Sequence, residues 1–593
     1  MSIKVKSIFL GILVLVGTAF LSGCTGKDRS QLNVFKIPLK DDVKTLDPVN
    51  VYDSVSTDVI QQIIEAPLQY KYLESKPTLE PLVAESMPEY SKDGLTVTLK
   101  LKKGIHFQDD PCFKDNGGKG RELKAQDFIY GFKRHAIPAI QSQGAWIFEG
   151  KIVGFDAFEK RMKEAKKEEL AKVMESPVEG FTAKDDYTIE FKLTQPYPIL
   201  NYILAMQFAT PVAPECAAMY ADADGNLRDH PVGTGPFMLK SWETNQKVVL
   251  VKNPNFRRTY PTEASEDLKA KGFLADAGKP IPFVDELDFY VVKEDMPRFL
   301  LFQKGDLDRI ELTKDTFEAG MLDATHVKPE LATKGVLYTD EDSLVDWYLG
   351  FNMNDKLLQN KYLRQAIALS IDREKYNNTF FQFHSSVQTQ VAPPQLADTL
   401  PQSTIKYGYN VPKAKELLAK AGYPEGKGLP TLNLDLRGPD TKYRQMGEFF
   451  VEQLGAIGIK VNVILNTFPA YLEKSKQNNL QVFLGGWNYD YPDAENGLQL
   501  LYGPNKSPGP NDTNFQNAQY DALYKKMAVL PAGAPGRSAL IKEMEAIVQE
   551  ESPWVYLTFE RLYNLYHSRV KNYRTAEVIP NKYKYVRIEQ DKK

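Results

Sequence analysis

The stretch 485–497, GGWNYDYPDAENG, places one carboxylate among aromatic residues. Trp487, Tyr489 and Tyr491 surround Asp490, and two glycines precede them. A carboxylate held in such surroundings costs free energy unless it is paired, so it is suited to binding a cation. The same pattern is also typical of the end of a β-hairpin whose aromatic residues belong to the core. The residues of this stretch alone leave both interpretations open.

The rest of the sequence contains no local signature of catalysis. It has no H-E-x-x-H, G-x-S-x-G or C-x-x-C motif. A catalytic triad scattered along the chain stays open. The sequence therefore favours a binding protein over an enzyme, and it predicts no metal and no cofactor. The histidines are too far apart in sequence for a metal-binding pair on one helix: His106, His135, His230, His326, His384 and His567.

Length and charge restrict the possibilities further. The chain has 593 residues, which is too long for one hydrophobic core and predicts two or three domains. Its formal net charge is -3, which argues against nucleic acid as a partner, because phosphate binding requires a basic surface. Charged residues make up 25% and hydrophobic residues 42%, as in ordinary globular proteins.

The N-terminus has the pattern of a secretory signal. Lys4 and Lys6 precede a mostly apolar run over 8–21, which is too short to span a bilayer comfortably. Leu-Ser-Gly-Cys follows and ends at Cys24. This ending resembles the lipobox of bacterial lipoproteins, which implies that Cys24 becomes the acylated first residue of the mature chain. We expect residues 1–23 to be removed, and the protein to be exported and lipid-anchored on the periplasmic or outer face of a bacterial membrane. A simple secretion signal is the alternative.

Two further cysteines remain, Cys112 and Cys216. Exported proteins occupy compartments where disulfides persist, and an even remainder of two permits one bridge. Two separate buried thiols are the other possibility, and the sequence does not decide between them.

Periodicity predicts strands that alternate with helices in the second half of the chain, which indicates an α/β fold. Strands are expected at 32–39, 94–107, 185–193, 431–438 and 460–466. Helices are expected at 58–66, 126–136, 361–376, 411–426 and 441–457.

Five stretches in order resemble one family, the bacterial extracellular solute-binding proteins of the peptide and nickel class. These proteins are the capture subunits of ABC importers. The resemblance covers essentially the whole mature chain. Its stretches are KTLDPVN (44–50), LVAESMPEYSKDGLTVTLKLKKGIHFQD (82–109) with RELKAQDFIYGFKR (121–134), VGTGPFMLKSW with KNPNF, FNMNDKLLQNKYLRQAIALSIDREK, and YNVPKAKELLAKAGYPEGKGLP.

The resemblance implies a two-lobe periplasmic-binding-protein fold of class II type, with an extra small domain inserted in the first lobe. We expect the chain to cross between the lobes near Val291–Glu294 and again near Ser552–Tyr556. The implied segments are 24–77 and 181–293 for the first lobe, 78–180 for the inserted domain, 294–553 for the second lobe and 554–593 for the return to the first lobe.

The resemblance also gives Asp490 a role. In peptide-binding members the matching aspartate pairs with the ligand's α-ammonium group, and Trp487 matches the family's tryptophan. Backbone groups around Gly486, Asn488 and Tyr489 are then expected to bind peptide main chain in strand fashion. Residues proposed as further walls of the site, each of which could equally be packing, are Tyr52, Ser54, Val55 and Trp146.

The leading interpretation is a monomeric peptide-binding lipoprotein that delivers its ligand to ABC transporter permease subunits. Two alternatives stay open. The same fold could bind a non-peptide solute such as a nickel chelate, an opine or a sugar, although Asp490 favours an amine over a neutral sugar. A surface hydrolase or adhesin is the alternative from another class.

Overall fold

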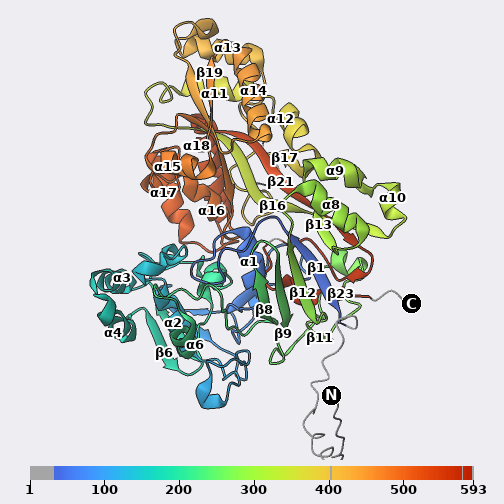
Figure 1. Cartoon of the computed structure of the whole chain (residues 1–593). Helices are drawn as coiled ribbons and strands as arrows, with labels where there is room; N and C mark the ends of the chain where they lie inside the picture. Colours follow the sequence, from blue (N-terminus) through green and yellow to red (C-terminus); the bar gives the residue numbers. More distant parts are fainter. Residues whose placement is uncertain (1–31, 401–403, 577, 590–593) are drawn as a thin grey trace, which may run out of the picture.

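The computed structural model describes residues 32–400, 404–576 and 578–589. The expected signal and Cys24 lie outside this part of the chain. Figure 1 shows two lobes, one formed mainly by the first half of the chain and the other by the yellow-to-red second half. Each lobe has its own sheet, and the alternation of strands and helices was predicted for the second half of the chain only.

The first lobe is built on a four-stranded sheet in the order β1-β12-β9-β8, with β1 and β12 parallel. Phe35 and Ile37 of β1 point into its core, where they meet Val59 of helix α1 and Tyr583 near the C-terminus. The C-terminal residues therefore complete the first lobe. Its elements are β1 (Val34–Leu39), α1 (Ser54–Ile60), β8 (Phe237–Glu243), β9 (Lys247–Lys252) and β12 (Glu286–Val291). Three two-stranded antiparallel sheets accompany them: β2 (Leu68–Tyr70) with β3 (Leu79–Pro81), β10 (Arg258–Thr259) with β11 (Pro280–Ile281), and β22 (Val570–Lys571) with β23 (Arg587–Ile588).

A second antiparallel sheet, in the order β4-β5-β7-β6, forms the inserted domain. The expected end of this domain at residue 180 is too early, because β6 and β7 complete its sheet. The sequence did not reveal this, because β5 pairs with β7 across some ninety residues, and no local signal marks such a partner. The elements are β4 (Glu89–Tyr90), β5 (Thr96–Lys100), α2 (Ala125–Arg134), α3 (Phe155–Glu164), α4 (Leu170–Glu175), β6 (Phe181–Asp185) and β7 (Thr188–Lys192), followed by α5 (Leu200–Ile203), α6 (Pro214–Tyr220) and α7 (Glu266–Ala270).

The structure contains a disulfide between Cys112 and Cys216, whose Cα atoms lie 4.9 Å apart. The bridge joins the turn after β5 to helix α6. Of the two possibilities that the cysteine count left open, the bonded one is present.

The second lobe holds a seven-stranded sheet in the order β13-β21-β16-β20-β18-β19, with β17 beside β21. The strands are β13 (Arg309–Glu311), β16 (Val336–Phe351), β17 (Ser385–Val387), β18 (Leu432–Leu436), β19 (Val461–Leu465), β20 (Val482–Asn488) and β21 (Trp554–His567), with the hairpin β14 (Met321–Asp323) and β15 (His326–Val327). The helices are α8 (Asp295–Lys304), α9 (Lys314–Gly320), α10 (Pro329–Ala332), α11 (Lys361–Ser370), α12 (Arg373–Phe380), α13 (Val411–Lys420), α14 (Thr441–Gly455), α15 (Phe468–Lys476), α16 (Ala494–Leu498), α17 (Ala518–Ala528) and α18 (Arg537–Glu551).

Of the two expected crossings, the one near Val291–Glu294 stays a prediction, and the strand pairing contradicts the other. β12 ends at Val291, and the next element, α8, belongs with the second lobe. The expected crossing at Ser552–Tyr556 is wrong, because β21 stays in the second-lobe sheet along its whole length. The chain rejoins the first-lobe core at Val570. A strand begins there after the long helix α18, but the sheet that this strand joins is set by its distant partner β16 and not by the local sequence.

Candidate functional site

Strand β20 presents an open edge at its C-terminal end. It pairs with β16 as far as Asn488, but its pairing with β18 ends at Phe483. In an antiparallel pair, successive residues direct their backbone groups to opposite sides of the strand. The carbonyl of Gly486 points to the β18 side, where the Arg437 guanidinium donates to it at 3.0 Å. The backbone groups of Gly486 and Asn488 therefore face the side that β18 leaves unpaired.

Gly486 is required by what lies over it. A Cβ at this position would be 2.8 Å from the Trp347 ring and 2.9 Å from Nη1 of Arg437. Trp347 is the β16 residue directly paired with Gly486. The glycine thus permits a tryptophan and an arginine to close over the strand.

A buried aspartate on the neighbouring strand β16 hydrogen-bonds to the same segment. Asp346 of β16 is fully buried, and its Oδ1 accepts the backbone N–H of Trp487 at 3.2 Å. The Tyr489 hydroxyl donates to its Oδ2 at 3.5 Å and to the Val391 carbonyl at 3.2 Å. Burial raises the pKa of Asp346 well above its usual range and so favours the uncharged form of this carboxyl group.

Asn496, in helix α16, connects the predicted site residues. Its Oδ1 accepts the indole N–H of Trp487 at 2.7 Å and the backbone N–H of Asp490 at 3.2 Å. Trp487 is therefore directed toward its own lobe and supports the turn. Because Asn496 is fully buried, it fixes where Asp490 stands.

Asp490 lies where the two lobes touch. Its Oδ1 accepts the Tyr52 hydroxyl of the first lobe at 3.1 Å. Among the described residues, no lysine, arginine or histidine nitrogen is within 4.0 Å of its carboxylate. Burial raises the pKa of Asp490 to about 6, and the hydrogen bond from the Tyr52 hydroxyl opposes that rise. The result is a carboxylate at the lobe contact that lacks a cationic partner within the described chain.

The other predicted wall residues differ in position. Ser54 is exposed at the first turn of α1. Val55 is a correction, because its side chain packs into the first-lobe core beside Val59, four residues later on the same helix face. Trp146 is half-buried, and its ring lies 6.5 Å from that of Tyr491 in the second lobe. Tyr52 and Trp146 therefore reach the lobe contact, whereas the Val55 side chain does not.

Arg437, one residue beyond β18, was not predicted. Its guanidinium lies over the rings of Trp347, Phe468 and Tyr471 at 5.2, 4.9 and 5.6 Å. No carboxylate oxygen of the described chain lies within 4.0 Å of it, and only the Gly486 carbonyl accepts from it. The sequence signal was a charged residue directly after a buried strand, in LNLDLRG. Arg437 therefore gives the site a cation that forms no ion pair within the described residues.

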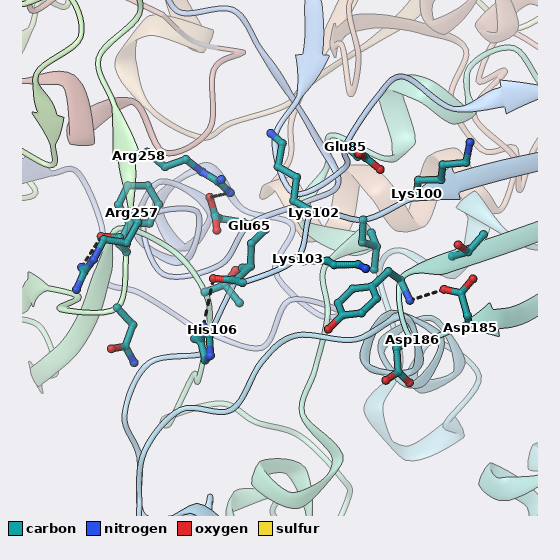
Figure 2. A pocket seen from close by; sticks show the side chains of 18 residues that line it. Glu65, Glu85, Lys100, Lys102, Lys103, His106, Asp185, Asp186, Arg257 and Arg258 are labelled. Carbon is teal, nitrogen blue, oxygen red and sulfur yellow. Dashed lines mark hydrogen bonds and ion pairs between the residues drawn. The ribbon is translucent and has the colours of Figure 1, made fainter.

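A large groove lies elsewhere, between the first lobe and the inserted domain, with a volume of about 1010 Å³ (Figure 2). None of its lining residues comes from the 485–497 segment. Arg258 pairs with Glu65 at 3.4 Å, and Lys102 donates to the Leu82 carbonyl at 2.8 Å. These inner charges are engaged by the protein itself, so the groove is not the site that the sequence predicted.

Within the described residues, no helix is both long and apolar enough to cross a membrane. The same part of the chain holds no group of three or more His, Cys, Asp or Glu side chains that could bind a metal ion.

Residues 78–509 match the family model for bacterial extracellular solute-binding proteins, family 5. The chain belongs to this family. It is a family of substrate-binding proteins of ABC importers, and the resemblance first seen in short motifs is confirmed.

Three curated relatives differ in the ligands that their names give. A heme-binding protein A of Haemophilus influenzae is 25% identical over 525 residues, covering 88% of this chain and 85% of the relative. A dipeptide-binding protein of Lactococcus lactis subsp. cremoris is 26% identical over 551 residues, covering 89% and 88%. A glutathione-binding protein of Escherichia coli O6:K15:H31 is 24% identical and covers 93% of both chains.

The solved structure of the periplasmic binding protein DppA from Helicobacter pylori, in complex with the peptide STSA, shares the fold. It has a TM-score of 0.71 at 23% identity and covers 95% of this chain and 99% of its own. The predicted two-lobe fold class is thereby confirmed.

Proposed function

We propose that this protein captures a short peptide with a free amino terminus and delivers it to an ABC transporter permease. The observation that carries the proposal is the Asp490 carboxylate, which lies at the contact of the lobes without a cationic partner in the described chain. A peptide ammonium group would supply that cation and form charge-assisted hydrogen bonds. Asp490 can accept it together with the Tyr52 hydroxyl, because an ionised carboxylate has about four acceptor positions.

The open edge of β20 supports binding of an extended main chain. Gly486 and Asn488 direct their backbone groups to the side where pairing with β18 has ended. An added peptide strand would use such groups without reading the ligand's side chains. The protein would therefore bind peptides of varied sequence.

Arg437 supports a second charged contact, with the ligand's carboxylate. It lies at Gly486, four residues before Asp490. Each strand residue adds about 3.3 Å, so the Cα atoms of Gly486 and Asp490 are at most about 13 Å apart. An extended peptide covers about 3.3–3.6 Å per residue, which matches a ligand of roughly two to four residues. Both ends of such a peptide would be neutralised.

Relatives named for dipeptide and for glutathione binding support a ligand that carries both an amine and a carboxylate. The relative named for heme binding leaves a different ligand class to be tested. Native mass spectrometry of the purified protein, followed by denaturation and sequencing of what is released, distinguishes a peptide ligand from another class of ligand. Released short peptides support the proposal, whereas a released porphyrin, or a sugar without an amine, contradicts it.

Export and lipid anchoring are part of the proposal and rest on the N-terminal sequence, with Cys24 as the acylated residue. The Cys24→Ser variant should lose labelling by a fatty-acid analogue and should appear in the soluble fraction. Labelling that persists in this variant would show that Cys24 is not the lipid attachment site.

A further inference from the structure

The Tyr491 side chain does not pack in the core of its own lobe. Tyr489 and Ala494 on either side belong to a second-lobe hydrophobic cluster. Tyr491 is 2% exposed and instead packs with a cluster formed otherwise by residues 68–281 and the C-terminal segment. Its ring is thus a second-lobe group buried in the opposite part of the molecule.

The Tyr491 ring stacks on two aromatic rings of the opposite part of the molecule. The Tyr202 ring, in α5, lies 5.9 Å from the Tyr491 ring at an interplanar angle of 11°. The Trp146 ring, in the 3-10 turn Ala145–Ile147, lies at 6.5 Å and 30°. Both angles describe stacked rings, and aromatic pairs at such distances attract beyond the area they bury. Trp146 belongs to the inserted domain, so that domain contacts the second lobe directly.

The hydroxyl of Tyr491 is fixed from its own side. It donates to Oε2 of Glu495 at 2.5 Å, and the Tyr524 hydroxyl donates to the same carboxylate. Burial raises the pKa of Glu495. Lys151 of the inserted domain faces it, and attraction to Glu495 partly offsets the lowering of the Lys151 pKa by burial. The second lobe therefore presents the Tyr491 ring in one orientation.

We propose that Tyr491 is a closure clasp, whose ring docks on Tyr202 and Trp146 and makes the inserted domain a closing partner of the second lobe. The proposal rests on the proposed capture of ligand between the lobes. It adds that part of the closure free energy comes from a protein–protein contact and not from the ligand. Asp490, one residue earlier, contacts Tyr52, so binding at Asp490 and docking of Tyr491 are coupled. The apparent affinity then depends on how much of the protein is closed.

The first test measures closure without depending on the ligand's identity. Spin labels at Lys172→Cys in α4 and Lys526→Cys in α17, both exposed positions, report the distance between inserted domain and second lobe. The labelled protein carries Cys24→Ser and keeps its disulfide. Without added ligand, Tyr491→Ala should shift the distance distribution to longer values. Tyr491→Phe keeps the ring and should resemble the wild type. Tyr409→Ala, at an exposed tyrosine, is the matched control. An unchanged distribution in Tyr491→Ala overturns the clasp.

The second test is a double-mutant cycle with trialanine as the probe. Tyr491→Ala and Tyr202→Ala should each weaken binding, by about tenfold. The double variant should lose little more than either single variant, because both remove the same contact. Two losses that simply add would overturn the direct contact. If trialanine does not bind the wild type, the peptide proposal fails, while the label distances still decide the clasp. Unchanged thermal midpoints confirm that the variants fold.

Discussion

Two aspartates from recognisable motifs have opposite surroundings. Asp47, in KTLDPVN, is fully buried and receives both terminal nitrogens of Arg134 at 2.9 and 2.8 Å, as well as the Leu227 backbone N–H at 2.8 Å. Asp490 receives a tyrosine hydroxyl and no cation of the described chain. The interactions around Asp47 lower its pKa despite strong desolvation, whereas burial raises that of Asp490 to about 6.

The difference between these two aspartates distinguishes a structural role from a binding role. Asp47 joins two signature segments, because Arg134 ends the signature helix α2. Its negative charge is paired with Arg134 inside the protein, so it is not available to a ligand. Asp490 keeps an acceptor available to a ligand at the contact of the lobes. A motif residue can therefore identify the family by holding the fold, while another carries the binding chemistry.

Asp47→Asn should give the largest effect on stability. It leaves the Arg134 guanidinium buried without its counter-charge, which costs about 3–5 kcal/mol in the free energy of unfolding. Denaturant titration followed by tryptophan fluorescence measures it. Asp41→Asn is the control, because Asp41 meets Lys293 at 3.4 Å on the surface and should cost less than about 1 kcal/mol. Equal losses in the two variants would remove the distinction between the two aspartates.

Asp490→Asn should do the reverse, with weaker binding and no loss of stability. The folded-state pKa of about 6 lies above the usual 3.8, so the ionised carboxylate disfavours folding at pH 7 and the amide removes that cost. A hydrogen bond to a charged group is worth about 1.5–3 kcal/mol, so trialanine should bind on the order of ten- to a hundred-fold more weakly. N-acetylating the peptide removes the same charge, so the two losses should overlap in calorimetry. If acetylated and free peptides bind the wild type equally, Asp490 is a structural turn residue.

Affinity should also fall with acidity in a defined window. The ammonium ligand requires ionised Asp490, whose pKa of about 6 in the free protein means that protonation competes below that pH. Between pH 7 and pH 5 the dissociation constant should rise about tenfold, while the peptide amine stays protonated. In Asp490→Asn the same titration should be flat. A wild-type profile that stays flat, or a slope that survives in the variant, would assign the proton to another group.

The sequence predicted the long periodic helices and strands well. It did not predict contacts between residues that are far apart in the chain. The helix expected at 441–457 is Thr441–Gly455. The helix expected at 58–66 is Ser54–Ile60, because Asp53 caps it by accepting the Ser56 N–H, while the prediction relied on a proline stop. The helix expected at 361–376 is two helices, since Asp372 begins the second one.

The same limit applies to the site. Asp490 and Trp487 came from a local motif. Arg437 and Asp346 act on that motif through strand pairing and packing, and no spacing in the sequence links them to it. Asn496 stands in the quoted stretch, but only the structure shows that its side chain accepts from Trp487 and Asp490. Tyr491 stood in the quoted motif, yet only the structure shows that its ring packs in the cluster formed by residues of the first lobe and the inserted domain.

The smallest expected effect concerns a third aspartate, Asp346, which lies between the two extremes. Like Asp47 it is fully buried, but it has no arginine or lysine within 4.0 Å in the described chain, and its pKa is raised by burial. Burial favours the protonated carboxyl group, which resembles an amide in shape and charge, so Asp346→Asn should change trialanine affinity by less than about threefold. Its Oδ1 can still accept the Trp487 N–H. Asp346→Leu has no acceptor and leaves that N–H unpaired, which costs about 1–3 kcal/mol and displaces the strand that carries Gly486. Calorimetry and thermal unfolding of both variants give the comparison. If Asn is as damaging as Leu, Asp346 acts through its charge, and the site would contain two ionised acids instead of one.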